Sequence, residues 1–171
     1  MNIVLTGFMG TGKTAVGRHL AERLKASFHD VDALIVKRAG KPVAQIFAEE
    51  GEPAFRELER QVIAELATKD HAVIATGGGA LVDSANRTAL ERSSLLVCLT
   101  ARTGTLLERL KDDVTRPLLA GEDLSAKIER LMKERESVYA ACRYQVATDG
   151  KTIAEVAGDI LQKVESQWPN G

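Results

Sequence analysis

Residues 7–14 read Gly7-Phe8-Met9-Gly10-Thr11-Gly12-Lys13-Thr14, which fits the pattern G-x-x-x-x-G-K-[ST]. The apolar residues 1–6 before this stretch predict a strand, and the residues from Ala15 onward predict a helix. The glycines let the backbone curl so that successive N–H groups point at phosphate oxygens, and the helix adds its free N–H groups and positive dipole end. Lys13 supplies a charge for the β- and γ-phosphates, and the Thr14 hydroxyl can bind Mg²⁺. The sequence therefore predicts a site for nucleotide phosphates, in preference to a glycine turn without a ligand.

The composition is that of an ordinary globular protein, with 171 residues, 44% of them hydrophobic and 27% charged, and a formal net charge of −1. This length fits one domain, residues 1–171, and the near-neutral charge gives no indication of nucleic-acid or membrane binding. The only cysteines are Cys98 and Cys142, which predicts a reduced cytoplasmic protein without a disulfide framework. The apolar N-terminus is too short for a signal peptide or a membrane span.

Strand-like and helix-like segments alternate along the chain. Apolar runs predict strands at residues 1–6, 26–32, 72–76, 95–99 and 144–147. Helices are predicted at residues 15–24, 33–38, 43–50, from 53 onward, and at 82–91, 103–111, 124–142 and 153–164. The periodicity breaks at residues 112–123, where we expect a mobile polar loop. The alternation predicts an α/β fold in which a central five-stranded parallel sheet is covered by helices on both faces.

The residues that follow the predicted strands are chemically distinctive. Ligands of open parallel sheets bind beyond the carboxyl ends of the strands, where Asp30, Asp32 and the triplet Gly77-Gly78-Gly79 fall. Asp30 and Asp32 have two possible roles. They could cap a helix at its N-terminus, or their carboxylates could face Mg²⁺ and an incoming hydroxyl group. Because they lie two residues apart in a segment predicted to be extended, both would face the site. The triplet fits either a tight turn or a surface where a ligand presses on backbone N–H groups, and we favour the latter.

Three arginines are candidates for anion binding. Arg135 lies on the apolar stripe of its helix, where a guanidinium is costly to bury unless an anion meets it. Arg56 has Glu59 three residues further along the same helix, which fits either a structural ion pair or an acid that orients the arginine toward a ligand. Arg116 lies in the polar loop, and mobile loops of phosphoryl-transfer enzymes often carry an arginine that closes late.

Together these stretches resemble shikimate kinase along the whole chain. The resemblance rests on residues 7–14, Asp30-Val31-Asp32, Phe55-Arg56-Glu57-Leu58-Glu59, Gly77-Gly78-Gly79 and Thr115-Arg116-Pro117-Leu118-Leu119. It implies a P-loop NTPase-type three-layer sandwich with a mobile lid at residues 112–123. The implied reaction is phosphorylation of the 3-hydroxyl of shikimate by ATP with Mg²⁺, a step toward chorismate and the aromatic amino acids. The implied protein is a cytoplasmic monomer.

The same resemblance assigns roles to individual residues. Asp32 would contact the hydroxyls of shikimate and is a candidate to accept the proton, whereas Thr14 would bind Mg²⁺ with Asp30 in its outer shell. The implied catalytic residues are Lys13, Asp32 and Arg116, the implied shikimate ligands are Asp32, Arg56, Gly77, Gly78, Gly79 and Arg135, and the implied ATP ligands are Gly10, Thr11, Gly12, Lys13, Thr14, Ala15, Arg109, Arg116 and Thr152. The family often has an arginine where this chain has Lys151 and Thr152, so its adenine contacts depart from the family pattern there.

Other functions are compatible with parts of the pattern. A gluconate kinase shares the fold and the phosphate loop but does not need the paired arginines, Asp32 and the glycine triplet together. A nucleoside monophosphate kinase would need arginines for two phosphorylated substrates, and a GTP switch would carry Asn-Lys-x-Asp, which does not occur in the chain. A nucleotide or shikimate sensor without catalysis would not need Lys13, Thr14, Asp30, Asp32 and Arg116 together.

Overall fold

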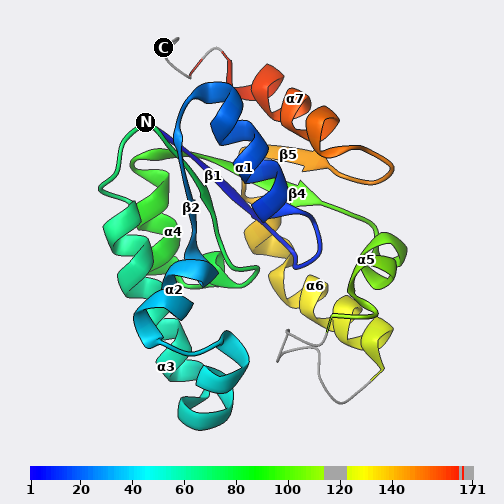
Figure 1. Cartoon of the computed structure of the whole chain (residues 1–171). Coiled ribbons are helices and arrows are strands. Elements are labelled where there is room, and N and C mark those ends of the chain that lie inside the picture. The colour runs from blue at the N-terminus through cyan, green and yellow to red at the C-terminus, as the bar shows by residue number, and fades with distance from the viewer. Residues whose placement is uncertain (114–122, 166, 168–171) are drawn as a thin grey trace.

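The computed structural model describes residues 1–113, 123–165 and 167, which form a parallel sheet of five strands with helices around it (Figure 1). The strands are β1 Asn2–Gly7, β2 Ser27–Asp30, β3 Ala72–Ala75, β4 Ser94–Thr100 and β5 Tyr144–Ala147. Their order in the sheet is β2-β3-β1-β4-β5, and every neighbouring pair is parallel. The helices are α1 Lys13–Leu24, α2 Val31–Ala39, α3 Val43–Leu66, the short 3-10 helix η1 Ala80–Val82, α4 Ser84–Glu91, α5 Thr103–Leu110, α6 Leu124–Ala140 and α7 Ile153–Val164.

Alternate residues of the strands point to opposite faces of the sheet, and each face has its own hydrophobic core. Val4 of β1 and Ile74 of β3 pack with buried residues of α2, α3 and α4. Ile3 and Leu5 of β1 pack instead with buried residues of α1 and α7. Helices therefore cover both faces of the sheet, and the predicted three-layer α/β architecture is confirmed. Strands that are covered on both faces consist of nearly continuous apolar residues, as these do.

The phosphate loop leaves the central strand at a point where only glycine fits. Gly7 pairs with Leu99 of β4 and has φ of 128°. A Cβ at this position would lie 2.2 Å from the carbonyl oxygen of Leu99. Gly12 closes the loop with φ of 89° and is the N-cap of α1, so the loop ends on the free N–H groups of a helix.

One boundary differs from the prediction in a way that bears on the site. The second strand ends at Asp30, and Asp32 lies in the first turn of α2 rather than in an extended segment. The prediction that strand alternation turns Asp30 and Asp32 to one side was therefore wrong, because the Asp30 side chain caps α2 and starts the helix there. The helices predicted before and after Gly51 are present, and they meet at a kink where Gly51 has φ of 81° and ψ of 170°.

Cys98 and Cys142 are both buried free cysteines. Among the residues that the structure describes, no helix is both long and apolar enough to span a membrane. Most of the loop predicted at 112–123 lies outside the described residues, namely 114–122, and with it the predicted site residue Arg116.

Candidate active site

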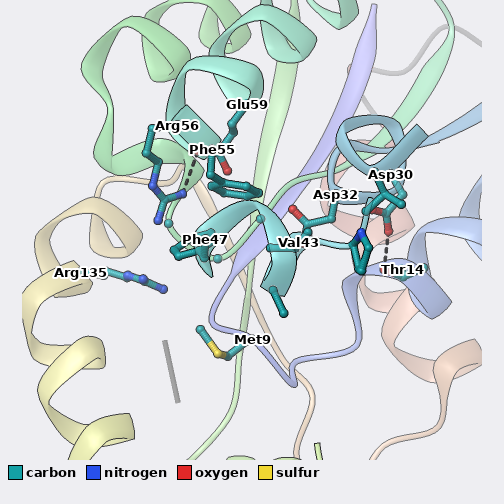
Figure 2. A pocket seen from close by; sticks show the side chains of 16 residues that line it. Met9, Thr14, Asp30, Asp32, Val43, Phe47, Phe55, Arg56, Glu59 and Arg135 are labelled. Carbon is teal, nitrogen blue, oxygen red and sulfur yellow. Dashed lines mark hydrogen bonds and ion pairs between the residues drawn. The ribbon is translucent and has the colours of Figure 1, made fainter. Parts of the chain in front are cut away.

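A pocket of about 500 Å³ lies beyond the carboxyl ends of β1, β2 and β3, as expected for an open parallel sheet. Figure 2 shows that acidic and basic side chains from different helices point into it, with aromatic and aliphatic side chains between them. Its lining consists of Met9, Thr14, Asp30, Asp32, Val36, Pro42, Val43, Ala44, Phe47, Phe55, Arg56, Glu59, Gly77, Gly78, Gly79 and Arg135. The structure thus brings the predicted residues of β1–α1, β2–α2, the glycine triplet, α3 and α6 together in one pocket.

Lys13, Thr14 and Asp30 lie at the start of α1 and the end of β2, where the phosphate loop borders the pocket. Lys13 Nζ donates to the carbonyl oxygens of Gly7 and Phe8 at 2.9 Å each, so its ammonium group lies over the loop. The Thr14 hydroxyl donates to Asp30 Oδ2 at 2.6 Å, and Oδ1 of the same carboxylate accepts the Ala33 N–H at 3.1 Å. Asp30 is therefore both the N-cap of α2 and the hydrogen-bond partner of Thr14.

Arg56 and Glu59 form an ion pair at the other end of the pocket. Arg56 Nη1 donates to Glu59 Oε2 at 2.8 Å, and the Glu59 side chain is only 1% exposed, whereas Arg56 is 24% exposed (Figure 2). Burial raises the pKa of Glu59, and the charge of Arg56 lowers it only in part. A carboxylate this deeply buried must keep a charged partner, so Glu59 fixes the guanidinium from the core side.

Arg135 lies on the same side of the pocket as Arg56, beside Gly79, and is almost completely buried, with 5% of its surface exposed. Its guanidinium carbon lies 5.7 Å from the centre of the Phe8 ring, within range of a cation–π contact. Its Nη1 is buried and has no hydrogen-bond partner among the described residues. An unpaired buried guanidinium N–H is costly, and in Figure 2 the side chain points into the pocket. This is the strongest local indication of an anionic ligand.

The glycine triplet leaves space for charged side chains of the pocket, which the sequence did not reveal. A Cβ on Gly77 would lie 2.9 Å from Glu59 Oε1 and 3.2 Å from Asp32 Oδ1. A Cβ on Gly79 would lie 2.8 Å from Arg56 Nη2 and 3.2 Å from Arg135 Nη2. Both guanidinium groups and both carboxylates therefore approach the bare backbone of this turn.

Tyr139 of α6 contacts the glycine triplet and was not predicted as a site residue. Its hydroxyl donates to the carbonyl oxygen of Gly78, 61 residues away in sequence, and so ties α6 to the glycine triplet. Tyr139 lies one helical turn after Arg135, which was the only signal in the sequence. Burial raises the pKa of Tyr139 to about 12, so the hydroxyl stays a donor at neutral pH.

Replacing Tyr139 by Phe is expected to make the free energy of unfolding fall less steeply as the pH rises above 10. Because the pKa of Tyr139 is raised from 10 to about 12, folding favours the protonated form. That contribution is complete below pH 10 and is lost as the pH rises toward 12. Urea unfolding at pH 8, 10 and 11 measures this, and the wild type should lose more stability than Tyr139→Phe across the range. Equal losses in both proteins would contradict the assignment.

The predicted adenine contacts lie away from this pocket. Arg109 donates from Nη1 to the Gly10 carbonyl at 3.0 Å and to the Thr148 hydroxyl at 3.0 Å, which links the phosphate loop to the end of β5. Thr152 is the N-cap of α7 and forms a capping box with Glu155. Arg109 therefore borders the phosphate loop, whereas the Thr152 hydroxyl has a structural partner.

A phosphate loop at the end of a central parallel strand, with a hydroxyl, carboxylates and arginines facing one pocket, defines the class of P-loop phosphotransferases. A family model described as shikimate kinase matches residues 9–165. Shikimate kinase of Symbiobacterium thermophilum is 44% identical, and the alignment covers all of both chains. The chain belongs to the shikimate kinase family. The reaction of this family is the ATP-dependent phosphorylation of shikimate in aromatic amino-acid biosynthesis, and this chain is such a kinase.

Two solved structures resemble this chain to different degrees. A structure of shikimate kinase from Acinetobacter baumannii in complex with shikimate has a TM-score of 0.94 and 38% identity, covering 98% of this chain and 94% of that one. A gluconokinase from Sinorhizobium meliloti has a TM-score of 0.66 at 20% identity, covering 96% of this chain and 91% of that one. The second likeness shows a shared fold only, so the gluconate kinase alternative gains no support from it.

Proposed function

We propose that this pocket binds the carboxylate of shikimate between Arg56 and Arg135 and directs its 3-hydroxyl toward the γ-phosphate of ATP. The observation that carries the proposal is the buried, unpartnered Nη1 of Arg135, which faces a pocket that also contains Arg56. A carboxylate accepts hydrogen bonds from guanidinium groups in a bidentate manner, so two arginines fit one such anion well. The backbone of Gly77, Gly78 and Gly79 would complete the cradle.

Asp32 is the residue that we assign to the reacting hydroxyl. It lines the same pocket as Thr14 and Asp30, which mark the phosphate end. A carboxylate there orients the hydroxyl in line with the phosphoryl group and can accept its proton as the bond forms. Lys13 and, from the loop outside the described residues, Arg116 would stabilise the negative charge on the transferred group.

The hydroxyl of Thr14 and the carboxylate of Asp30 fit Mg²⁺. They are 2.6 Å apart, and Mg²⁺ prefers oxygen ligands and usually keeps several waters, so one or two protein groups suffice. Thr14 would bind the ion directly, and Asp30 would hold it directly or through water. When bound, Mg²⁺ neutralises charge on the β- and γ-phosphates.

The proposal is tested by an ADP-release assay with ATP and Mg²⁺, comparing shikimate, gluconate, AMP and no acceptor. We expect turnover with shikimate alone. Turnover with gluconate or AMP would keep the fold and the phosphate loop but overturn the substrate. Folded protein that binds ATP and releases no ADP with any acceptor would favour the sensor alternative.

Replacing Gly79 by Ala is expected to raise KM for shikimate by roughly tenfold, because the new methyl group intrudes between two guanidinium groups and overpacking costs about 1–3 kcal/mol. Gly79 has φ of −102°, so alanine is allowed by the backbone and only the space changes. Gly104→Ala is the matched control, since a Cβ there meets nothing within 4 Å. An unchanged KM in Gly79→Ala would contradict the cradle.

The remaining expectations are proposals about the whole protein. We propose that residues 1–171 form one kinase domain whose lid spans about 112–123, and that the protein works in the cytoplasm as a monomer. A small-molecule substrate, and neither nucleic acid nor membrane, is the partner that the pocket fits. Size-exclusion chromatography with light scattering would test the monomer.

A further inference from the structure

Arg56 has a second carboxylate partner that the binding scheme above does not use. Its Nε and Nη2 donate to Oε1 of Glu52 at 3.4 and 3.2 Å, in addition to the 2.8 Å bond from Nη1 to Glu59. Glu52 lies four residues before Arg56, directly after the kink at Gly51. A single guanidinium is therefore shared between two acids, through different nitrogen atoms.

The two acids differ in how easily they can leave Arg56. The Glu59 side chain is 1% exposed, so loss of its bond would leave a buried charge without its partner. The Glu52 side chain is 49% exposed, and its two bonds to Arg56 are longer. Water can replace the Glu52 contact at little cost, because exposed ion pairs contribute little stability. Glu59 therefore fixes Arg56, whereas Glu52 is the exchangeable partner.

Glu52 approaches Arg56 from outside the pocket. It lines a neighbouring hollow of about 520 Å³, and Arg56, Gly79 and Arg135 line both this hollow and the pocket. Glu52 itself is not part of the pocket lining. Its contact therefore occupies Nε and Nη2 of Arg56 without filling the space where a ligand would lie.

The charges around the arginines make this contact unfavourable for an anionic substrate. Asp30, Asp32 and Glu59 line the pocket together with Arg56 and Arg135, so three carboxylates already face two guanidinium groups. Glu52 adds a fourth carboxylate next to Arg56. A substrate carboxylate that approaches Arg56 therefore meets a guanidinium that already donates three of its five N–H groups to acids, and it meets a negative charge nearby.

We propose that Glu52 competes with the substrate carboxylate for Arg56 and releases the guanidinium when the substrate binds. The inference rests on the proposed function of this site, in which Arg56 and Arg135 bind that carboxylate. Glu52 then keeps Arg56 paired while the pocket is empty, and it lowers the affinity for the substrate. Binding becomes an exchange of one carboxylate for another.

The test is the affinity of the full chain for shikimate without nucleotide, measured by isothermal titration calorimetry. Glu52→Gln is expected to lower Kd by about two- to fivefold, the range that corresponds to an exposed ion pair. Glu52→Asp keeps the charge on a shorter side chain and is expected to give part of the gain. KM for shikimate should fall with Kd in Glu52→Gln.

Glu50→Gln is the matched control. The Glu50 side chain has a similar exposed fraction of 45%, and Glu50→Gln makes the same change of charge. Glu50 pairs with Lys41, which also pairs with Glu49. A gain in Glu52→Gln and not in Glu50→Gln supports the competition. An unchanged or higher Kd in Glu52→Gln, or equal gains in both variants, would overturn it while turnover with shikimate stays intact. Wild-type protein that neither binds nor phosphorylates shikimate would overturn the proposed function itself.

Discussion

Replacing Asp32 by Asn is expected to lower kcat by roughly a hundred- to ten-thousandfold, the range that general acid–base groups contribute. Asp32 lines the pocket together with Thr14 and Asp30. The amide keeps the shape of the side chain, but it cannot take up a proton or supply the negative charge that orients the hydroxyl. Initial rates at saturating shikimate and ATP measure kcat, and calorimetry should show unchanged ATP binding because the phosphate loop is untouched.

Asp70→Asn is the control for this change. Asp70 is 80% exposed, pairs with the terminal ammonium group of Met1 and lies outside the pocket. Asp70→Asn therefore makes the same change of charge as Asp32→Asn, and it should leave the turnover rate unchanged. Normal turnover in Asp32→Asn would remove the role assigned to Asp32. A pH profile of the residual rate separates a base from a residue that only orients, since loss of a base removes its titration from kcat.

Replacing Arg135 by Met is expected to lower kcat/KM for shikimate by roughly a hundredfold or more, because hydrogen bonds to charged groups contribute about 1.5–3 kcal/mol each. Arg135 is 5% exposed and its Nη1 has no hydrogen-bond partner among the described residues, so the substrate carboxylate would be the acceptor for that N–H group. Methionine keeps much of the apolar volume against Phe8. Steady-state rates at varied shikimate should place most of the loss in KM.

Arg130→Met is the matched control on the same helix. Arg130 is 55% exposed and pairs with Glu134 at 3.1 Å, so its loss should leave KM for shikimate near the wild-type value. Melting temperatures of both variants show whether the fold is intact. An unchanged KM in Arg135→Met would mean that the substrate carboxylate binds elsewhere.

The elements of this fold could be predicted because their signals are local. The strand before the phosphate loop and the helix of residues 153–164 were expected where the structure has β1 and α7. Apolar periodicity reports which face of an element is buried. The same reasoning placed Arg135 on an inward stripe, and it is buried.

The prediction failed where a side chain decides a boundary. The Asp30 carboxylate accepts the Ala33 N–H and starts α2, so Asp32 is helical and not extended. Asp30 and Asp32 still line one pocket, but for a different reason. The first turn of α2 brings Asp32 back over the end of the sheet, which strand alternation cannot describe.

The sequence by itself determined the parallel α/β architecture, the phosphate loop and the set of residues at the carboxyl edge of the sheet. It did so because glycine patterns and periodicity act over a few neighbouring residues. Only the tertiary structure decided that Glu59 and Asp32 meet Gly77, that both guanidinium groups meet Gly79, and that Tyr139 holds Gly78. These contacts join segments far apart in the chain, and the order of strands and the packing of α3 and α6 against that edge bring them together.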